Sequence, residues 1–230
     1  MTRRNPLEVV YFSDLLCVWA YAGQVRVDEL RDQMEDEIRL TDRFLNVYGD
    51  VPGRIQKHAG SAAQPAATYA KRMRAVAGGF EHTNMSERCF TEVCPLSSNQ
   101  AHLVLSAVRT MVDDGAVEGG GTLPALIRRV RLAFFEEALD VGRLDVLYGL
   151  LEDGDVPRGP VEERLANGTA MAALSADLLE KDNLSVTGSP TWVLDGGRQK
   201  LFGNVGYRVV AANVNELLRA DQSRSGASWC

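Results

Sequence analysis

Strand patterns occur only near the two ends of this 230-residue chain, and this placement restricts the fold more than any other feature of the sequence. Residues 7–12 form a short β-branched and aromatic run, and a looser alternation of apolar residues covers residues 38–47. Near the other end, residues 191–194 and 199–202 flank an Asp-Gly-Gly turn at residues 195–197, which is typical of a β-hairpin. The pattern predicts one α/β domain assembled from two separated halves.

Between these two halves the apolar residues follow a helical spacing instead. Amphipathic helices are predicted in the middle of the chain, after the first strand and after the hairpin, at residues 18–35, 101–112, 123–134 and 207–218. One more helix begins after Thr169, and its spacing places four residues in the core: Met171, Leu174, Ser175 and Leu178. The sequence therefore predicts a helical insertion between a β-α-β half and a β-β-α half.

The same pattern divides the chain into predicted domains. We expect residues 1–55 and 183–222 to form one domain around the sheet, residues 56–182 to form an inserted helical domain, and residues 223–230 to form a flexible tail. The apolar share of 45% and the charged share of 24% are ordinary for a globular chain. This composition excludes a disordered protein and a fibrous repeat.

Charge and hydropathy exclude two classes of partner. The net charge of −6 gives no general attraction to nucleic-acid phosphates or to anionic membranes, so we expect neither partner. The apolar run near the N-terminus is too short for a signal peptide, and charged residues interrupt every stretch that a membrane-spanning helix would need. We therefore expect a soluble protein of the cytoplasm, where cysteines stay reduced.

Cys17 lies where the first predicted strand gives way to the first predicted helix. A thiol at a helix N-terminus faces unpaired backbone N–H groups and the positive end of the helix dipole, and both lower its pKa. The sequence therefore predicts an activated thiol at Cys17, with simple packing in the core as the alternative. Asp14 either influences the charge near this thiol or caps a surface turn, and Trp19 either lines a substrate groove or anchors the helix.

A second motif, Gly188-Ser189-Pro190, comes directly before the predicted hairpin. Proline is tolerated at the entry to a strand because no ladder hydrogen bond is lost there, and a peptide bond before proline can be cis. Taken with Cys17, the motif resembles the thioredoxin-fold proteins of the DsbA type, and the resemblance covers nearly the whole chain. That family has a helical domain inserted between the two halves of a thioredoxin fold, which is the arrangement predicted here.

The resemblance implies an active site around Cys17. The family's redox motif is C-x-x-C at the start of the first helix, and here Cys17 matches its first cysteine while Ala20 stands in the place of the second. The loop before the hairpin resembles the family's cis-proline loop, which lies beside the active thiol and pairs with a bound peptide or glutathione. Cys17 is thus the implied catalytic residue, and the implied substrate-binding residues are Ser13, Asp14, Trp19, Gly188, Ser189 and Pro190.

Two branches of this superfamily compete. FrnE-like disulfide oxidoreductases have a motif resembling D-x-x-C-P-W-C-Y, and the chain matches it at Asp14, Cys17, Trp19 and Tyr21 and resembles them again at Ala101-His102 and residues 133–136. The 2-hydroxychromene-2-carboxylate isomerases and kappa-class glutathione transferases carry a serine at the active position, in motifs resembling L-S-P-F-A-Y. The chain matches those at Leu16, Ala20 and Tyr21, with Cys17 in place of serine, and their F-G-S-P loop is similar to residues 188–190.

Each branch implies a different reaction. The first implies a disulfide oxidoreductase that works as a monothiol, because Ala20 removes the internal resolving thiol and glutathione must attack the mixed disulfide instead. Cys89 or Cys94 is the other candidate for that resolving role, with a buried and inactive thiol as the alternative. The second branch implies a glutathione-dependent transferase or isomerase. The absence of the second cysteine, at Ala20, also fits a third hypothesis, that the protein binds a partner without catalysing a reaction.

The expected partners are protein thiols or a small thiol or aromatic substrate, with glutathione as a co-substrate and no tightly bound cofactor. The histidines at positions 58, 82 and 102 lack the spacing of a metal site, so we expect no metal. Four phenylalanines of the predicted insertion can form either its core or the surface of a homodimer: Phe80, Phe90, Phe134 and Phe135.

Overall fold

The computed structural model of the protein describes residues 5–117 and 121–222. In these residues the elements follow in the order β1 (Leu7–Ser13), α1 (Val18–Gln33), β2 (Ile38–Phe44), α2 (Val51–Ala59), α3 (Pro65–Ala77), α4 (Asn99–Asp113), α5 (Thr122–Phe135), α6 (Leu144–Asp153), α7 (Arg158–Ala166), α8 (Thr169–Asn183), β3 (Thr191–Leu194), a 3₁₀ turn η1 (Asp195–Gly197), β4 (Gln199–Phe202) and α9 (Tyr207–Gln222). The predicted tail, residues 223–230, lies outside the described residues, and Cys230 with it.

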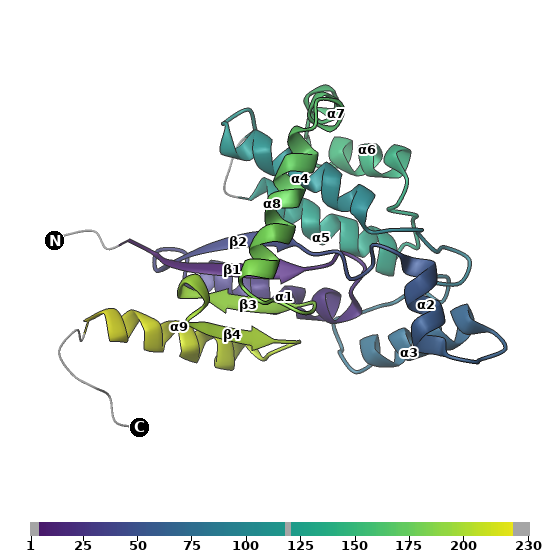
Figure 1. The fold of residues 1–230 in the computed structure, drawn as a ribbon, viewed down its shortest axis with the longest axis horizontal. Coiled ribbons are helices and arrows are strands. Elements are labelled where there is room, and N and C mark those ends of the chain that lie inside the picture. Colours follow the sequence, from purple (N-terminus) through teal and green to yellow (C-terminus); the bar gives the residue numbers. More distant parts are fainter. Residues whose placement is uncertain (1–4, 118–120, 223–230) are drawn as a thin grey trace.

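The sheet joins both ends of the chain. Its strand order is β2-β1-β3-β4, and β1 runs parallel to β2 but antiparallel to β3, which in turn runs antiparallel to β4. Val9 of β1 is opposite Leu194 of β3, so the N-terminal and C-terminal halves pair along the middle of the sheet. This arrangement confirms the predicted fold class, an α/β protein with helices inserted between a β-α-β half and a β-β-α half (Figure 1).

Both faces of β1 are buried, which explains its nearly continuous apolar sequence. Val9 and Tyr11 point to the face covered by α1 and α9, where they pack in one cluster with Leu30 and Val214. Phe12 points to the opposite face and packs with residues that include Val193. The sheet is therefore the middle layer of the molecule, and its central strand leads directly to Cys17.

The helices between β2 and β3 enclose the largest apolar cluster. Figure 1 shows α4, α5, α6 and α7 gathered beyond the β2 edge of the sheet, while α2 and α3 lie near the end to which β1 points. Phe90, Phe134 and Phe135 are fully buried in this cluster, so they form core and not a dimer surface. Cys17 belongs to the same cluster, which places it at the junction of the sheet and the helices.

Several helices differ from the sequence-based prediction. The sequence prediction places no helix directly after β2, because Pro52 and Gly53 are typical turn residues. In the structure Asp50 caps α2 by accepting from the Gly53 N–H, and Pro52 lies in the first turn, where no N–H is needed. In α8 the predicted burial is confirmed for Leu174 but is wrong for Met171, which is 52% exposed, and for Ser175, which is exposed. Ala170 and Asp177 complete the buried face of α8, and the Asp177 carboxylate pairs there with a buried arginine of α4.

The predicted domain limits can be placed on these elements. The limit at residue 55 falls inside α2, and the limit at residue 183 falls on the last residue of α8. Strand β2 ends at Phe44, three residues earlier than the predicted segment. Across residues 5–117 and 121–222, none of the helices has the length and hydropathy needed to cross a membrane.

Candidate active site

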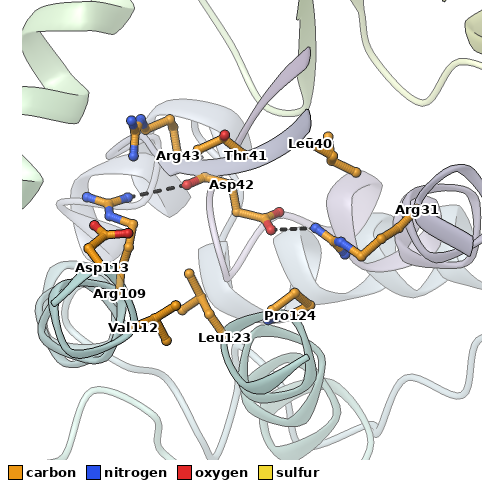
Figure 2. A pocket seen from close by; sticks show the side chains of 10 residues that line it. All are labelled: Arg31, Leu40, Thr41, Asp42, Arg43, Arg109, Val112, Asp113, Leu123 and Pro124. Atoms are coloured by element: carbon orange, nitrogen blue, oxygen red, sulfur yellow. Dashed lines mark hydrogen bonds and ion pairs between the residues drawn. The ribbon is translucent and has the colours of Figure 1, made fainter. Parts of the chain in front are cut away.

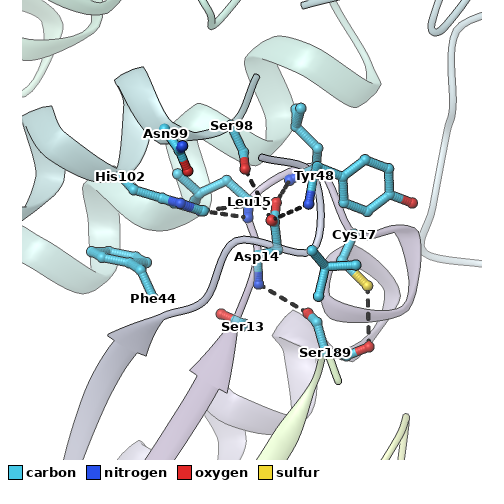
Figure 3. A network of polar contacts seen from close by, with 12 residues as sticks. Ser13, Asp14, Leu15, Cys17, Phe44, Tyr48, Ser98, Asn99, His102 and Ser189 are labelled. Atoms are coloured by element: carbon cyan, nitrogen blue, oxygen red, sulfur yellow. Dashed lines mark hydrogen bonds and ion pairs between the residues drawn. The ribbon is translucent and has the colours of Figure 1, made fainter. Parts of the chain in front are cut away.

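Cys17 and the loop before β3 meet across a long sequence separation. Cys17 is the N-cap residue of α1, and its Sγ donates to the backbone carbonyl oxygen of Ser189, 3.3 Å away and 172 positions along the chain. The peptide bond between Ser189 and Pro190 is cis. Figure 3 shows the two loops facing each other. The structure thus brings together Cys17, Ser189 and Pro190, three of the predicted site residues.

Asp14 holds the loop that carries Cys17. Its side chain is fully buried, and its carboxylate accepts from the Leu16 N–H at 2.9 Å, from the Tyr48 N–H at 2.8 Å and from the Ser98 hydroxyl at 2.9 Å. Its own N–H donates to the Ser189 Oγ at 2.9 Å (Figure 3). The alternative in which Asp14 caps a surface turn is therefore wrong, because this carboxylate is an internal acceptor that ties three segments together.

His102 of α4 completes this network. The imidazole is fully buried, stacks on the Phe44 ring with centroids 5.1 Å apart, and accepts from the Leu15 N–H through Nε2 at 3.3 Å. Burial lowers the pKa of His102, so the ring is neutral and its proton lies on Nδ1. Nδ1 finds no hydrogen-bond partner among the described residues. His102 therefore fixes the loop as a hydrogen-bond acceptor.

The thiol pKa differs in direction from the prediction. Burial raises the pKa of Cys17, with the Asp14 charge adding to the rise, while the Ser189 side chain and the N–H groups of Ala20 and Trp19 act in the opposite sense. Only 4% of Cys17 is exposed, so the cost of desolvating a thiolate exceeds the help from the helix N-terminus. The prediction of a lowered pKa is wrong for this conformation.

Two exposed aromatic side chains lie next to the thiol and its loop. Trp19, in the first turn of α1, is 43% exposed and contacts the Phe80 ring edge-on. Phe202 of β4 is 67% exposed and packs over Gly188, where an added Cβ would meet the Phe202 ring at 2.6 Å. Trp19 is therefore available to a substrate, and the close approach of Phe202 leaves no room for a Cβ at Gly188 unless the exposed ring moves. The sequence analysis missed Phe202 because a hairpin residue carries no motif.

The remaining predicted residue, Ser13, faces away from this contact. Its hydroxyl accepts from the Arg131 guanidinium of α5 at 2.7 Å.

The two candidate resolving cysteines lie in the helical part of the chain. Cys89 is fully buried, and its thiol donates to the Phe134 carbonyl oxygen at 3.0 Å. Burial raises the pKa of Cys89 to about 11. Cys94 is half-buried, and all the described cysteines are free thiols. Neither Cys89 nor Cys94 is bonded to Cys17.

One cavity reaches this site, and another lies at the edge of the sheet. The first, of about 390 Å³, is lined by residues 45–47, 181–182 and 185–188, and so reaches the cis-proline loop. The other, of about 310 Å³, lies at the β2 edge (Figure 2). Its charged groups are largely satisfied, because Arg31 pairs with Asp42 at 2.8 Å and Arg109 pairs with Asp177 at 2.8 Å. Within the described part of the chain, no three side chains gather as a metal site would require.

Comparison with known proteins identifies the family. The model of the DSBA-like thioredoxin domain matches residues 8–215, which is nearly the whole chain. The chain belongs to the family of DSBA-like thioredoxin domains. A search of curated protein sequences found no match. In this DSBA-like protein, Cys17 directly precedes α1 and the cis Ser189–Pro190 bond directly precedes β3.

Solved structures of the same fold come from oxidoreductases and an isomerase. A protein described as a probable DsbA oxidoreductase from Streptomyces coelicolor superposes with a TM-score of 0.69 at 20% identity, covering 97% of this chain and 94% of its own. The cytosolic disulfide reductase DsbM from Pseudomonas aeruginosa gives 0.65 at 16% identity, covering 95% and 100%. A 2-hydroxychromene-2-carboxylate isomerase gives 0.60 at 16% identity, also covering 95% and 100%. These likenesses establish the shared fold.

Proposed function

We propose that this protein is a thiol-disulfide oxidoreductase that works as a monothiol, with Cys17 as the nucleophile and glutathione as the resolving thiol. The observation that carries the proposal is the 3.3 Å contact between the Cys17 Sγ and the Ser189 carbonyl oxygen at the cis Ser189–Pro190 bond. The family and its oxidoreductase neighbours support the reaction class, and a structure of DsbM from Pseudomonas aeruginosa with GSH supports glutathione as partner.

The reaction needs two exchanges at Cys17 and a third between two glutathiones. In the first, the Cys17 thiolate attacks one sulfur of a substrate disulfide, so that a Cys17–substrate disulfide forms and the other sulfur leaves as a thiolate. Ala20 offers no second thiol, so a glutathione thiolate attacks the substrate sulfur of this mixed disulfide and releases the Cys17 thiolate. These two exchanges free one half of the substrate as a thiolate and leave the other half joined to glutathione. A second glutathione thiolate then attacks the glutathione sulfur of that disulfide, which frees the remaining substrate thiolate and forms glutathione disulfide. Two glutathiones are thus oxidised for each substrate disulfide that is reduced. Such a cycle needs reduced glutathione, which fits a location in the cytoplasm.

The site would support this cycle in two ways. The Ser189 side chain and the N–H groups of Ala20 and Trp19 act to lower the pKa of Cys17, against the effect of burial, and so favour its thiolate form. Trp19 and Phe202 offer exposed aromatic surface for the apolar part of a substrate. Because burial raises the pKa of Cys17, we expect the rate of exchange to increase with pH up to and beyond pH 9.

A second candidate function is a glutathione-dependent transferase or isomerase. It is favoured by the protonation state of Cys17, whose thiol donates a hydrogen bond and whose pKa is raised. A protonated thiol at this position can donate to a glutathione thiolate, as a serine hydroxyl would. The isomerase among the structural neighbours supports this alternative.

One set of variants separates the two functions. The wild type, Cys17→Ala and Cys17→Ser are assayed for glutathione-coupled reduction of a small disulfide and for conjugation of glutathione to a chlorinated aromatic. The half-buried thiol of Cys94 supplies the control Cys94→Ala. Oxidoreductase function predicts loss of disulfide reduction in both Cys17 variants and normal rates in the control. Conjugation that survives in Cys17→Ser, without disulfide reduction by the wild type, would favour the transferase.

A further inference from the structure

A separate cavity of about 220 Å³ lies between α1 and α5. Tyr21 and Val25 of α1 line it on one side, and Arg128 and Arg131 of α5 line it on the other, with Glu136 directly after α5. Cys17 and Ser189 are not among its lining residues. The volume is below the roughly 300 Å³ at which pockets for drug-sized molecules begin, so the cavity suits a smaller ligand.

Arg131 places in this wall a buried guanidinium that forms no ion pair and has one unfilled donor among the described residues. The residue is 1% exposed, and its guanidinium donates to two neutral acceptors, the Ser13 hydroxyl at 2.7 Å and the Gln24 side-chain oxygen. Its Nε has no acceptor among the described residues. Arg128 of the same helix pairs with Asp28, but no carboxylate in the described ranges forms an ion pair with Arg131. The buried Asp42 carboxylate attracts this guanidinium from beyond ion-pair distance, but its own ion-pair partner is Arg31. The buried Nε donor of Arg131 is still unfilled, so this position favours an anionic acceptor nearby.

Glu136 places an unmatched negative charge in the same wall. Its carboxylate accepts from the Tyr21 hydroxyl at 2.6 Å, and the pKa of Tyr21 is raised by burial and by this bond, so the phenol remains a donor. The next residue, Glu137, pairs with Arg129 at 2.7 Å. Glu136 has no such cation within the described part of the chain. The cavity therefore presents one unpaired charge of each sign.

We propose that this cavity binds a small α-amino acid in its zwitterionic form. The ligand carboxylate lies beside Arg128 and Arg131, and the ligand ammonium lies beside Glu136. Val25 and Leu132 form the apolar part of the lining and contact the ligand side chain. A ligand with only one charge leaves either Arg131 or Glu136 unmatched, whereas an α-amino acid neutralises both.

The test is isothermal titration calorimetry of the full-length protein at neutral pH. The probes are L-alanine, L-valine and L-glutamate, and the controls are propionate and ethylamine, each of which carries one of the two charges. The matched variant is Glu136→Gln, which keeps an acceptor for Tyr21 but removes the charge. We expect the amino acid that binds best to bind at least about tenfold more weakly to this variant, because a charged hydrogen bond is lost.

The melting temperature of Glu136→Gln without ligand checks that the variant is folded. A second variant, Cys17→Ala, is expected to bind the amino acid like the wild type, since the cavity and the thiol are separate. Binding that survives in Cys17→Ala while disulfide exchange is lost supports the cavity independently of the proposed function. The proposal is overturned if none of the three amino acids binds, if propionate binds as tightly as they do, or if Glu136→Gln leaves the affinity unchanged.

Discussion

The loop that carries Cys17 and the β2 edge of the sheet both bury a carboxylate, but they stabilise it by different means. At the loop, Asp14 accepts from two backbone N–H groups and one hydroxyl (Figure 3). At the edge, Asp177 pairs with Arg109 at 2.8 Å and with Arg43 at 3.4 Å, next to the cavity of Figure 2. Backbone donors fix the path of the chain, whereas arginine partners join separate elements.

The two carboxylates are therefore expected to have different roles: Asp14 positions the loop before the reactive thiol, and Asp177 stabilises the fold. The Asp14 bonds set the backbone of the residues directly before Cys17, so their loss should change the reactivity of the thiol. The Asp177 pairs connect α8 with α4 and β2, and Asp177 also accepts from the Phe44 N–H at 3.1 Å on the outer edge of the sheet. Loss of Asp177 should therefore change the stability of the fold far more than the chemistry of Cys17.

The largest expected effect is at Asp177. Replacement Asp177→Ala leaves the Arg109 guanidinium buried without its carboxylate, and such a loss costs about 3–5 kcal/mol of unfolding free energy. Urea unfolding measures the loss, and the alkylation rate of Cys17 in the folded fraction should stay within about twofold of wild type. The double variant Asp177→Leu with Arg109→Leu should recover part of the stability. If Asp177→Ala were as stable as the wild type, the carboxylate at the β2 edge would not stabilise the fold, and the proposed difference from the Cys17 loop would be wrong.

A smaller loss of stability, with a clear change in thiol chemistry, is expected at Asp14. Asp14→Asn keeps the size of the side chain and one acceptor oxygen, and we expect it to cost about 2–3 kcal/mol because other donors lose their acceptor. The Asp14 charge is one cause of the raised pKa of Cys17, so this pKa should fall in the variant.

The pH dependence of iodoacetamide labelling measures the Cys17 pKa in the wild type and in Asp14→Asn, both in a Cys94→Ala background. An unchanged midpoint in Asp14→Asn would show that the carboxylate does not act on the thiol. If Asp14→Asn lost much stability but left the pKa of Cys17 unchanged, Asp14 would act only on the stability of the fold, as Asp177 does at the β2 edge.

His102 should give the loop an acid-sensitive stability that the arginine pairs lack. The folded-state pKa of His102 lies below its ordinary value of 6.5, so its contribution is fully present above pH 6.5 and decreases as the pH falls below it. The slope from this one group is at most about 1.4 kcal/mol per pH unit. Urea unfolding at a series of pH values should show this decrease in the wild type and not in His102→Gln, whose amide oxygen can accept from Leu15. Parallel curves for the two proteins would contradict a neutral buried imidazole.

The smallest expected effect is at Gly188. An added Cβ in Gly188→Ala would meet the Phe202 ring at 2.6 Å, but that ring is 67% exposed and can turn into solvent. We expect a stability loss below about 1 kcal/mol and a change in the affinity for substrate, because Phe202 leaves the loop. Phe202→Ala is the control, since it removes the ring without the clash, and the double variant should match it. A loss of several kcal/mol would mean that the loop cannot adjust.

The sequence predicts well those parts of the molecule in which local periodicity decides the structure. Strand β1, helix α4 and the β3–β4 hairpin follow from apolar spacing and turn residues, and their existence is confirmed. Helix α2 is missed because Pro52 and Gly53 read as a turn, although they form its first turn. Asp177 is missed as a core residue because burial of a carboxylate depends on Arg109, 68 positions away.

The candidate site likewise contains residues that the sequence predicts and residues that it does not. Cys17 and residues 188–190 are found by their motifs, and the structure places Cys17 against Ser189. The residues that fix the loop are not found, because Tyr48, Ser98 and His102 are 34 to 87 positions away from the groups that they bind. The raised pKa of Cys17 is missed for a related reason: position at a helix N-terminus is visible in the sequence, but the depth of burial is not.

The measurement that tests the central claim most directly is intact-protein mass after incubation with oxidised glutathione over a series of pH values. Attack by the Cys17 thiolate adds one glutathione and releases the other as a thiol. We predict a single adduct whose rate of formation increases with pH beyond pH 9, in the wild type and in Cys94→Ala, and no adduct in Cys17→Ala. An adduct that persists in Cys17→Ala, or a wild type that forms none at any pH, would contradict Cys17 as the reactive thiol.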